Sequence, residues 1–185
     1  MRLTAFAAAV SVLLLVSGCA PKPVEPLKPV TPVPEHSERL FETPEEALAA
    51  AEAAYAEYQA MSNLIASEGG KDPERIAPYV TEELLPRELE VSGLFTQYEL
   101  RAEGEATFDS IRLQQYFTAS EGHTTVVVYL CNDVSPARII DKSGADVTPD
   151  RPERVLLEVE FEARGPEPIE MLVARSEIWD ETLPC

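Results

Sequence analysis

Few side chains in this 185-residue chain could perform nucleophilic chemistry. The chain contains three cysteines and two histidines, His36 and His123. Two histidines cannot form a three-histidine metal site, and a Ser-His-Asp arrangement would depend on His123 alone, because His36 lies in a proline-rich stretch. His123 begins a strand-like segment beside a turn, where a surface role is expected. Cys131 is a candidate nucleophile, but it would need an activating base that the sequence does not supply.

Carboxylates are abundant, with 33 aspartate and glutamate residues, so chance pairs are expected. Asp109 and Asp133 each lie in a strand-like segment with apolar neighbours, where burial would raise the pKa of a carboxyl group as acid–base catalysis requires; the family resemblance described below is what implies a cavity for them. Aspartate near a strand end more commonly accepts local hydrogen bonds. The sequence therefore favours a non-catalytic protein and keeps an enzyme with an aspartate acid or base as an alternative.

The segment Asp141-x-Ser143-Gly144-x-Asp146 has oxygen ligands at close spacing, as calcium-binding loops do. It lacks the spacing and the late bidentate glutamate of an EF-hand. A turn built from aspartate and glycine explains the pattern better. We therefore expect neither a metal nor another cofactor.

The first residues of the chain have the features of a targeting signal. Arg2 precedes an apolar run from Leu3 to Val16, which is too short to span a bilayer. Val16-Ser17-Gly18-Cys19 closes this run and resembles the lipobox of a bacterial lipoprotein signal. The resemblance implies that residues 1–18 are removed and that Cys19 carries a diacylglyceryl group, which anchors the chain on the extracytoplasmic face of the cell membrane. A plain signal peptide and an uncleaved anchor are the alternatives.

A proline-rich tether is expected to follow the lipidated cysteine, so that residues 19–36 form a spacer. Six prolines lie between Ala20 and His36. Such a composition favours polyproline II, which at about 3.1 Å per residue would extend on the order of 50 Å. The segment Pro29-Val30-Thr31-Pro32 also fits a P-x-x-P ligand, which is the alternative role.

Cys131 and Cys185 remain as a pair once Cys19 is assigned to the lipid. In an oxidising compartment, an even pair predicts a disulfide. The bond would close a loop of about 55 residues and, by chain entropy, contribute about 4 kcal/mol to stability. We therefore predict that Cys185 is pinned to the strand that contains Cys131.

The net charge of the chain lies in the segment 37–185. Residues 1–36 contain three basic and two acidic residues of the totals 15 and 33, which leaves 12 basic and 31 acidic residues, a net charge of −19, for this segment. So negative a domain repels phosphates, which argues against a nucleic-acid partner. The charge is also compatible with a simple role in solubility.

The first half of the domain is expected to be helical. Thr43-Pro44-Glu45-Glu46 predicts the start of a helix with Thr43 as N-cap, and Gly69-Gly70 predicts its end. Asp72-Pro73 predicts a short helix to about residue 79. Thr81 is expected to open a third helix, interrupted or restarted at Pro86 and ending near residue 96.

The second half has the alternating pattern of strands joined in an antiparallel meander. Gly104 is the expected bend of the first, long strand. The predicted strands are Arg101–Phe117, His123–Asp133, Arg138–Asp141, Arg154–Ala163 and Ile169–Trp179. We therefore expect an α+β domain over residues 37–185, with N-terminal helices packed on a curved, mainly antiparallel sheet.

This order of elements is similar to the nuclear transport factor 2-like fold, a cone-shaped domain shared with polyketide cyclases of the SnoaL type. The segments Val128–Ser135 and Asp141–Val147, with Trp179 and Cys185, look like a group of actinobacterial lipoproteins. The likeness extends over about residues 43–185. It implies a domain that works in the cell envelope.

The resemblance also implies a cavity between helices and sheet, which Asp109, Asp133 and Tyr129 could line. Cone folds often pair through the open sheet face, so a homodimer is possible by analogy. Ten aromatic residues could line such a pocket, but their spacing favours the core. They are Tyr55, Tyr58, Phe95, Tyr98, Phe108, Tyr116, Phe117, Tyr129, Phe161 and Trp179.

The sequence thus predicts a lipid-anchored lipoprotein that acts as a non-catalytic binding or interaction module of the cell envelope. Its partner would be an envelope protein or a small molecule. Two alternatives remain: a binder of a small apolar ligand in the cone cavity, and a cavity enzyme with an aspartate acid or base.

Overall fold

The first helix, α1 (Pro44–Ser67), begins and ends where the sequence predicts. The computed structural model describes residues 40–118, 123–165, 168–179 and 185, so the predicted signal peptide, Cys19 and the tether lie outside the described residues. The Thr43 hydroxyl accepts a hydrogen bond from the Glu46 N–H at 3.1 Å, while the Glu46 carboxylate accepts one from the Glu42 N–H at 2.8 Å. The Gly70 N–H donates to the Ile65 carbonyl at 2.9 Å and so caps the other end.

Two shorter helices follow α1, namely the 3₁₀ helix η1 (Pro73–Tyr79) and the α-helix α2 (Leu85–Gln97). The expected start of the third helix at Thr81 is wrong, because residues 81–84 form a turn in which the Thr81 carbonyl accepts from the Leu84 N–H. Pro86 then lies in the first turn of α2, where its missing N–H costs nothing. The restart that the proline predicted is therefore the start of α2.

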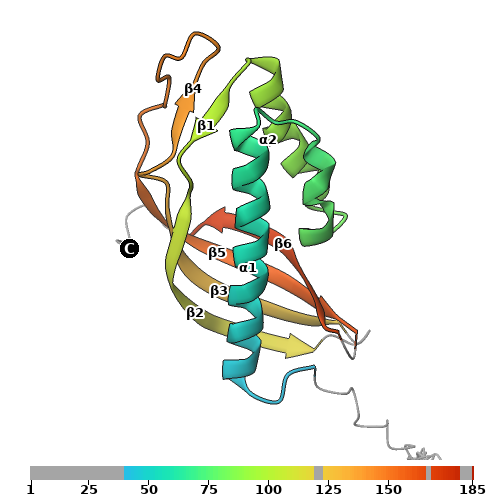
Figure 1. Cartoon of the computed structure of the whole chain (residues 1–185). Coiled ribbons are helices and arrows are strands. Elements are labelled where there is room, and N and C mark those ends of the chain that lie inside the picture. The colour runs from blue at the N-terminus through green and yellow to red at the C-terminus, as the bar shows by residue number, and fades with distance from the viewer. Residues whose placement is uncertain (1–39, 119–122, 166–167, 180–184) are drawn as a thin grey trace, which may run out of the picture. The chain divides into compact units, whose positions relative to one another are not determined.

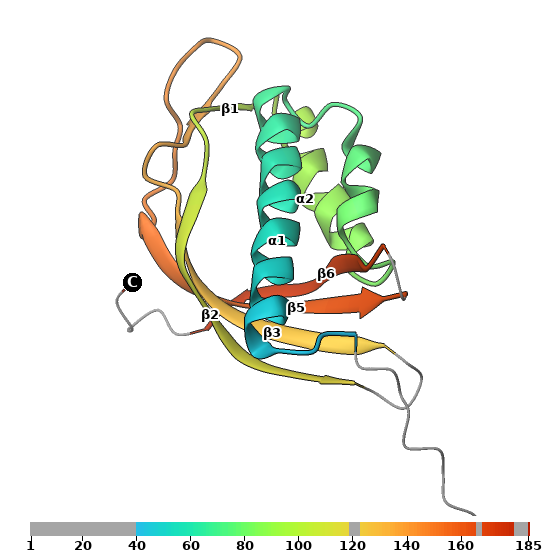
Figure 2. The same cartoon turned by 60° about the horizontal axis from the view of Figure 1, so that its bottom comes forward.

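Four antiparallel strands form the main sheet in the order β2-β3-β5-β6. Val128 of β3 lies opposite Val159 of β5, and this register continues along both strands. The strands are β2 (Thr107–Thr118), β3 (Thr124–Asp133), β5 (Arg154–Arg164) and β6 (Glu170–Ile178). The sheet curves beneath α1, as Figures 1 and 2 show.

A second, two-stranded sheet pairs β1 (Arg101–Glu103) with β4 (Arg138–Ile140). The prediction of one bent strand over residues 101–117 is therefore wrong, because β1 and β2 belong to different sheets. Gly104 separates them with a φ of +80°, and a Cβ atom at this position would lie 2.1 Å from the Pro136 carbonyl oxygen. The strand is interrupted at Gly104, because only glycine permits this backbone conformation and this close approach to Pro136.

The core lies between α1 and one face of the main sheet. Alternate residues of β3 face this core, whereas Val127, Tyr129 and Cys131 point to the opposite side, which we call the outer face. The ring of Tyr55 on α1 meets Phe108 of β2 edge-on, with ring centres 4.9 Å apart. The predicted fold class, helices packed on a curved, mainly antiparallel sheet, is confirmed. No helix among the described residues is long and apolar enough to cross a membrane.

The expectation that the aromatic residues belong to the core holds for some of them only. Tyr55 and Phe161 are buried, with exposed fractions of 3% and 0%. Tyr98, Phe117 and Trp179 are 61%, 50% and 51% exposed. These three lie at the end of α2, on β2 and just after β6, which alternating or helical spacing alone could not distinguish from core positions.

Candidate functional site

Asp109 and Asp133 lie together on the outer face, where both bind Arg154. The Arg154 guanidinium donates to both carboxylate oxygens of Asp109, at 3.0 and 2.8 Å, and to Asp133 at 2.8 Å. The Ser110 hydroxyl donates to Asp109, and the Ser135 N–H donates to Asp133. These serine hydrogen bonds and the ion pair with Arg154 lower the pKa of both carboxyl groups.

This arrangement is unsuited to the acid–base role that was considered for the two aspartates. A general acid or base needs a carboxyl pKa near the working pH, whereas these carboxylates are held in the ionised form. Both groups are also placed on the outer face and away from the helix–sheet interface, where the cavity was expected. The interface itself is filled by packed side chains such as Tyr55, Val128 and Phe161.

Tyr129 and Trp179 line a depression of mixed polarity on the outer face. Their ring centres are 5.1 Å apart. The Trp179 N–H donates to the Leu156 carbonyl at 2.9 Å, which fixes the chain after β6 beside β5. The depression measures about 340 Å³ and is lined by Arg112, Leu113, Gln114, Tyr129, Leu156 and Trp179. Tyr129 is thus a pocket residue, but its pocket opens on the outer face.

Cys131 and Cys185 line one further depression of the outer face, next to Ser110, Ile111 and Arg112. Both are present as free thiols, Cys131 buried and Cys185 exposed. Loss of hydration raises the pKa of the Cys185 thiol to about 11, and a hydrogen bond with Cys131 acts in the same direction. The structure therefore brings the two cysteines of the predicted pair together.

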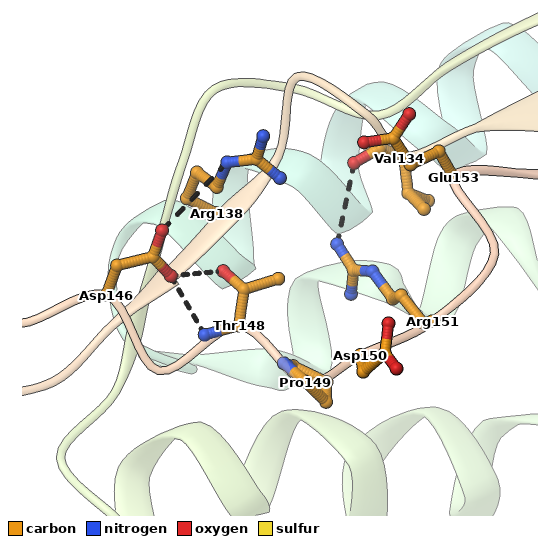
Figure 3. A pocket seen from close by; sticks show the side chains of 8 residues that line it. All are labelled: Val134, Arg138, Asp146, Thr148, Pro149, Asp150, Arg151 and Glu153. Carbon is orange, nitrogen blue, oxygen red and sulfur yellow. Dashed lines mark hydrogen bonds and ion pairs between the residues drawn. The ribbon is translucent and has the colours of Figure 1, made fainter.

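A polar depression of about 440 Å³ lies among the loops beyond β3 and β4 (Figure 3). Arg138 lies 4.0 Å from the Asp146 carboxylate at one end, and Arg151 donates to the carbonyl of Val134 at 3.5 Å at the other. Arg151 also donates to the Ala137 carbonyl at 3.1 Å. Both arginines thus bind groups of the loops themselves, which indicates that their main role is to hold these loops together.

The weak calcium-loop pattern is a hydrogen-bonded turn in the structure. The Asp141 carboxylate accepts from the Ser143 N–H, the Ser143 hydroxyl and the Ala145 N–H, at 2.8, 2.6 and 3.0 Å. Asp146 accepts from the N–H and the hydroxyl of Thr148, as the dashed lines in Figure 3 show. These hydrogen bonds lower the pKa of both carboxyl groups. Each aspartate therefore performs the local role that aspartate commonly has in turns.

The most perturbed carboxyl group of the helices is one that sequence reasoning missed. Glu88 of α2 is half-buried against α1, where the Tyr58 hydroxyl donates to its carboxylate at 3.1 Å. Burial raises the pKa of Glu88, and burial also raises the pKa of Tyr58 and Tyr55. Helical spacing alone could not identify Glu88, because its partner is 30 residues away.

Helix α2 carries an exposed apolar surface along one side, which we call the α2 stripe. Val91 and Leu94 are 49% and 45% exposed, and Tyr98 follows them at the end of the helix. Positions three and four residues apart on a helix are neighbours, so these side chains form one continuous surface. None of the residues of α2, all of which are described, is buried.

Close backbone contacts hold α2 in this position. A Cβ atom on Gly70 would lie 2.2 Å from the Ser92 carbonyl oxygen, so the turn after α1 touches the backbone of α2. The Thr96 hydroxyl lies 3.1 and 3.3 Å from the carbonyl oxygens of Gly69 and Gly70. The helix is thus attached through its backbone and through half-buried residues such as Phe95, while the α2 stripe faces outward.

The α2 stripe lies in the most acidic part of the described chain. Residues 40–100 contain 13 acidic and three basic residues, a net charge of −10 over 61 positions. Residues 101–185 contain 17 acidic and eight basic residues, a net charge of −9 over 85 positions. Five arginines of this second segment form ion pairs with neighbouring acids, namely Arg101, Arg138, Arg154, Arg164 and Arg175.

The comparisons with known proteins establish a fold likeness only. No family model and no curated protein matches the chain. Among solved structures, the chain is similar to the intermembrane space region of the chloroplast protein ARC6, with 13% identity, a TM-score of 0.52, and coverage of 71% of this chain and 95% of that one. A periplasmic fragment of TraM aligns with 14% identity and a TM-score of 0.47, over 68% of this chain and 92% of that one.

Proposed function

We propose that the protein is a lipid-anchored, extracytoplasmic and non-catalytic interaction module that binds its partner through the α2 stripe. The single observation that carries the proposal is the exposure of Val91, Leu94 and Tyr98 on a helix that has no buried residue. Exposed apolar side chains scattered singly need no explanation, but three adjacent ones on one helix side form a surface suited to a partner.

The proposed location depends on the leader sequence. Val16-Ser17-Gly18-Cys19 after a short apolar run supports lipidation at Cys19 and a domain outside the cytoplasm. The fold is compatible with such a place, because the ARC6 fragment that shares it is an intermembrane space region. The tether of residues 19–36 would let the acidic domain work away from anionic headgroups, since charge is screened over about 8 Å at physiological salt.

The partner that fits the α2 stripe is a basic amphipathic segment of an envelope protein. Its apolar side would cover Val91, Leu94 and Tyr98, in the manner of helix-in-groove recognition. Its basic side chains would meet the acidic surroundings, where residues 40–100 have a net charge of −10. Charge complementarity of this kind accelerates association and selects the partner.

The proposal can be tested with a synthetic helical peptide of 15 residues that has leucine at one-side spacing and lysine elsewhere. Binding of the labelled peptide to the full-length lipoprotein in detergent would be followed by fluorescence anisotropy. Leu94→Asp should weaken binding at least tenfold. Val147→Asp is the matched control, because Val147 is also 45% exposed but lies in a loop outside α2, and it should leave binding unchanged.

Two further peptides separate docking from plain charge attraction. A scrambled peptide with the same lysines should bind at least tenfold more weakly, and a peptide with glutamate in place of lysine should not bind. Equal binding of the scrambled peptide, or an equal loss in Leu94→Asp and Val147→Asp, would contradict docking on the α2 stripe.

A small apolar ligand in the depression beside Tyr129 and Trp179 is the second candidate function. The observation that favours it is a lining in which Leu113, Tyr129 and Leu156 lie next to an exposed tryptophan, the only one in the sequence, beside the polar Arg112 and Gln114. Titration with an apolar fluorescent probe should then shift Trp179 emission to saturation, and Tyr129→Ala should abolish the shift. A linear, unsaturable response would remove this candidate.

A further inference from the structure

We propose that Cys131 and Cys185 form an intramolecular disulfide that fastens the C-terminal residue to the outer face of the sheet. The proposal is independent of the partner of the α2 stripe, which lies on a different element. It makes the pair a modification site with a defined structural effect.

The position of both thiols supports the bond. Cys131 lies on the outer face near the end of β3, is 3% exposed, and faces the same depression as Cys185. Asp109 is its neighbour across β2, and Leu156 is its neighbour across β5. In Figures 1 and 2 the C-terminal end lies beside β2, on the side away from α1. Cys185 is thus on the side of the sheet to which Cys131 points.

Trp179, which follows β6, also lies near this place. The Trp179 N–H donates to the carbonyl of Leu156, and Leu156 is the register partner of Cys131. Neighbouring strands lie about 4.8 Å apart, so Trp179 is bound next to the residue that flanks Cys131. Six residues lie from Asp180 to Cys185, enough chain to reach across one strand, since each extended residue spans about 3.3 Å.

The chemistry would be thiol–disulfide exchange with a disulfide oxidant, of the kind found in oxidising compartments. Cys185, the exposed thiol, would lose its proton and attack one sulfur of the oxidant, which breaks the oxidant's S–S bond and releases its other sulfur as a thiolate. Cys131 would then lose its proton and attack Cys185, which releases the second oxidant thiolate. Two protons and two electrons leave the protein, and the oxidant becomes two thiols.

The bond can be detected directly in peptides of the full-length lipoprotein. The protein would be isolated from its own cells, with free thiols blocked by iodoacetamide and without reductant, and then digested with trypsin. Cleavage after Arg112, Arg138 and Arg175 gives the peptides 113–138 and 176–185, each with one cysteine. The proposal predicts that these two peptides are recovered as one linked species that separates on reduction. Recovery of both as alkylated free thiols, or of two copies of 176–185 linked together, would overturn it.

Thermal unfolding gives a second measurement that does not depend on recovery of peptides. Cys185→Ser should lower the Tm by about 5–10 °C under non-reducing conditions, and Cys131→Ala combined with it should add little beyond the loss of one small buried group. Reductant should lower the wild-type Tm to the value of Cys185→Ser and leave that of the variant unchanged. Equal Tm values for wild type and Cys185→Ser without reductant would contradict the bond.

Discussion

Helices α1 and α2 lie in the same part of the domain, yet they relate to it in opposite ways. Five residues of α1 are buried, namely Ala47, Ala51, Tyr55, Gln59 and Ile65. No residue of α2 is buried, and Val91, Leu94 and the C-cap Tyr98 are exposed. Most apolar residues of α1 are thus explained by packing against the sheet, with Leu64, 43% exposed, as an exception. Those of the α2 stripe are not, which is why we assign them to binding.

The same contrast appears in how the two helices are held. α1 contributes side chains to the core, so its sequence is constrained by shape. α2 is attached by the close approach of Gly70 to Ser92, by contacts of Thr96 with the Gly69 and Gly70 carbonyls, and by the Tyr58–Glu88 hydrogen bond. Surface side chains of α2 should therefore be replaceable without loss of the fold.

The largest effect is expected from a tyrosine-to-alanine substitution made in α1 and, for comparison, at the C-cap of α2. Tyr55→Ala should destabilise the domain by about 3–5 kcal/mol, because it removes a buried ring that contacts Phe108. Tyr98→Ala should change stability by about 0.5 kcal/mol or less, because this side chain is 61% exposed. Urea unfolding of both variants measures the difference. Similar losses in the two would show that the α2 stripe is part of the core after all.

A glycine-to-alanine pair tests how α2 is attached. Gly70→Ala should cost about 2–3 kcal/mol, because Gly70 has a φ of +76° and a Cβ would clash with the Ser92 carbonyl. Gly93→Ala, inside α2, meets no atom within 4 Å and should stabilise by about 0.5–1 kcal/mol. Opposite signs in denaturant unfolding are the expected result. A loss at Gly93 would mean that this side of α2 is more crowded than the structure shows.

The smallest effect concerns the buried contact of the two helices. Burial raises the pKa of Glu88 in the folded state, so folding retains a proton that the unfolded chain releases, and stability falls as the pH rises from the ordinary glutamate pKa through the raised one. The Glu88→Gln side chain can still accept a hydrogen bond from Tyr58. The free energy of unfolding of this variant, relative to wild type, should be higher at pH 7 than at pH 4 by on the order of 0.5 kcal/mol. Glu90→Gln, an exposed change on α2, controls for the lost charge. Thermal unfolding of both variants would be measured at both pH values. An equal pH-dependent change in stability for Glu88→Gln and Glu90→Gln would contradict the burial of Glu88.

The sequence predicted those features that depend on local chemistry. The capping residues of α1, its glycine stop and the core-facing alternate residues of β5 are local patterns, and the structure has all three. The bend at Gly104 was predicted, but the separation of β1 and β2 into different sheets was not, because it depends on the approach of Pro136, which is 32 positions away in the chain.

The candidate site was less predictable for the same reason. Cys131 and Cys185 were predicted to pair because they are the two cysteines that remain once Cys19 is assigned to the lipid. The structure places both in the lining of one depression. Asp109 and Asp133 were considered for a cavity, but their neighbour Arg154 and their place on the outer face depend on strand register. The α2 stripe could not be predicted either, since exposed and buried apolar residues have the same helical spacing.

The most direct test of the account is photo-cross-linking in the protein's own cells. A benzophenone amino acid would replace Leu94 of the α2 stripe, Glu52 on the exposed side of α1, or Phe117 on the outer face. Each replacement would be made in the full-length protein, and the cross-linked peptides would be sequenced. We expect that position 94 alone links to one segment of an envelope protein, and that this segment is basic with apolar residues at helical spacing. Cross-links from position 117 but not from 94, or from 94 to an acidic segment or a second copy of this chain, would contradict it.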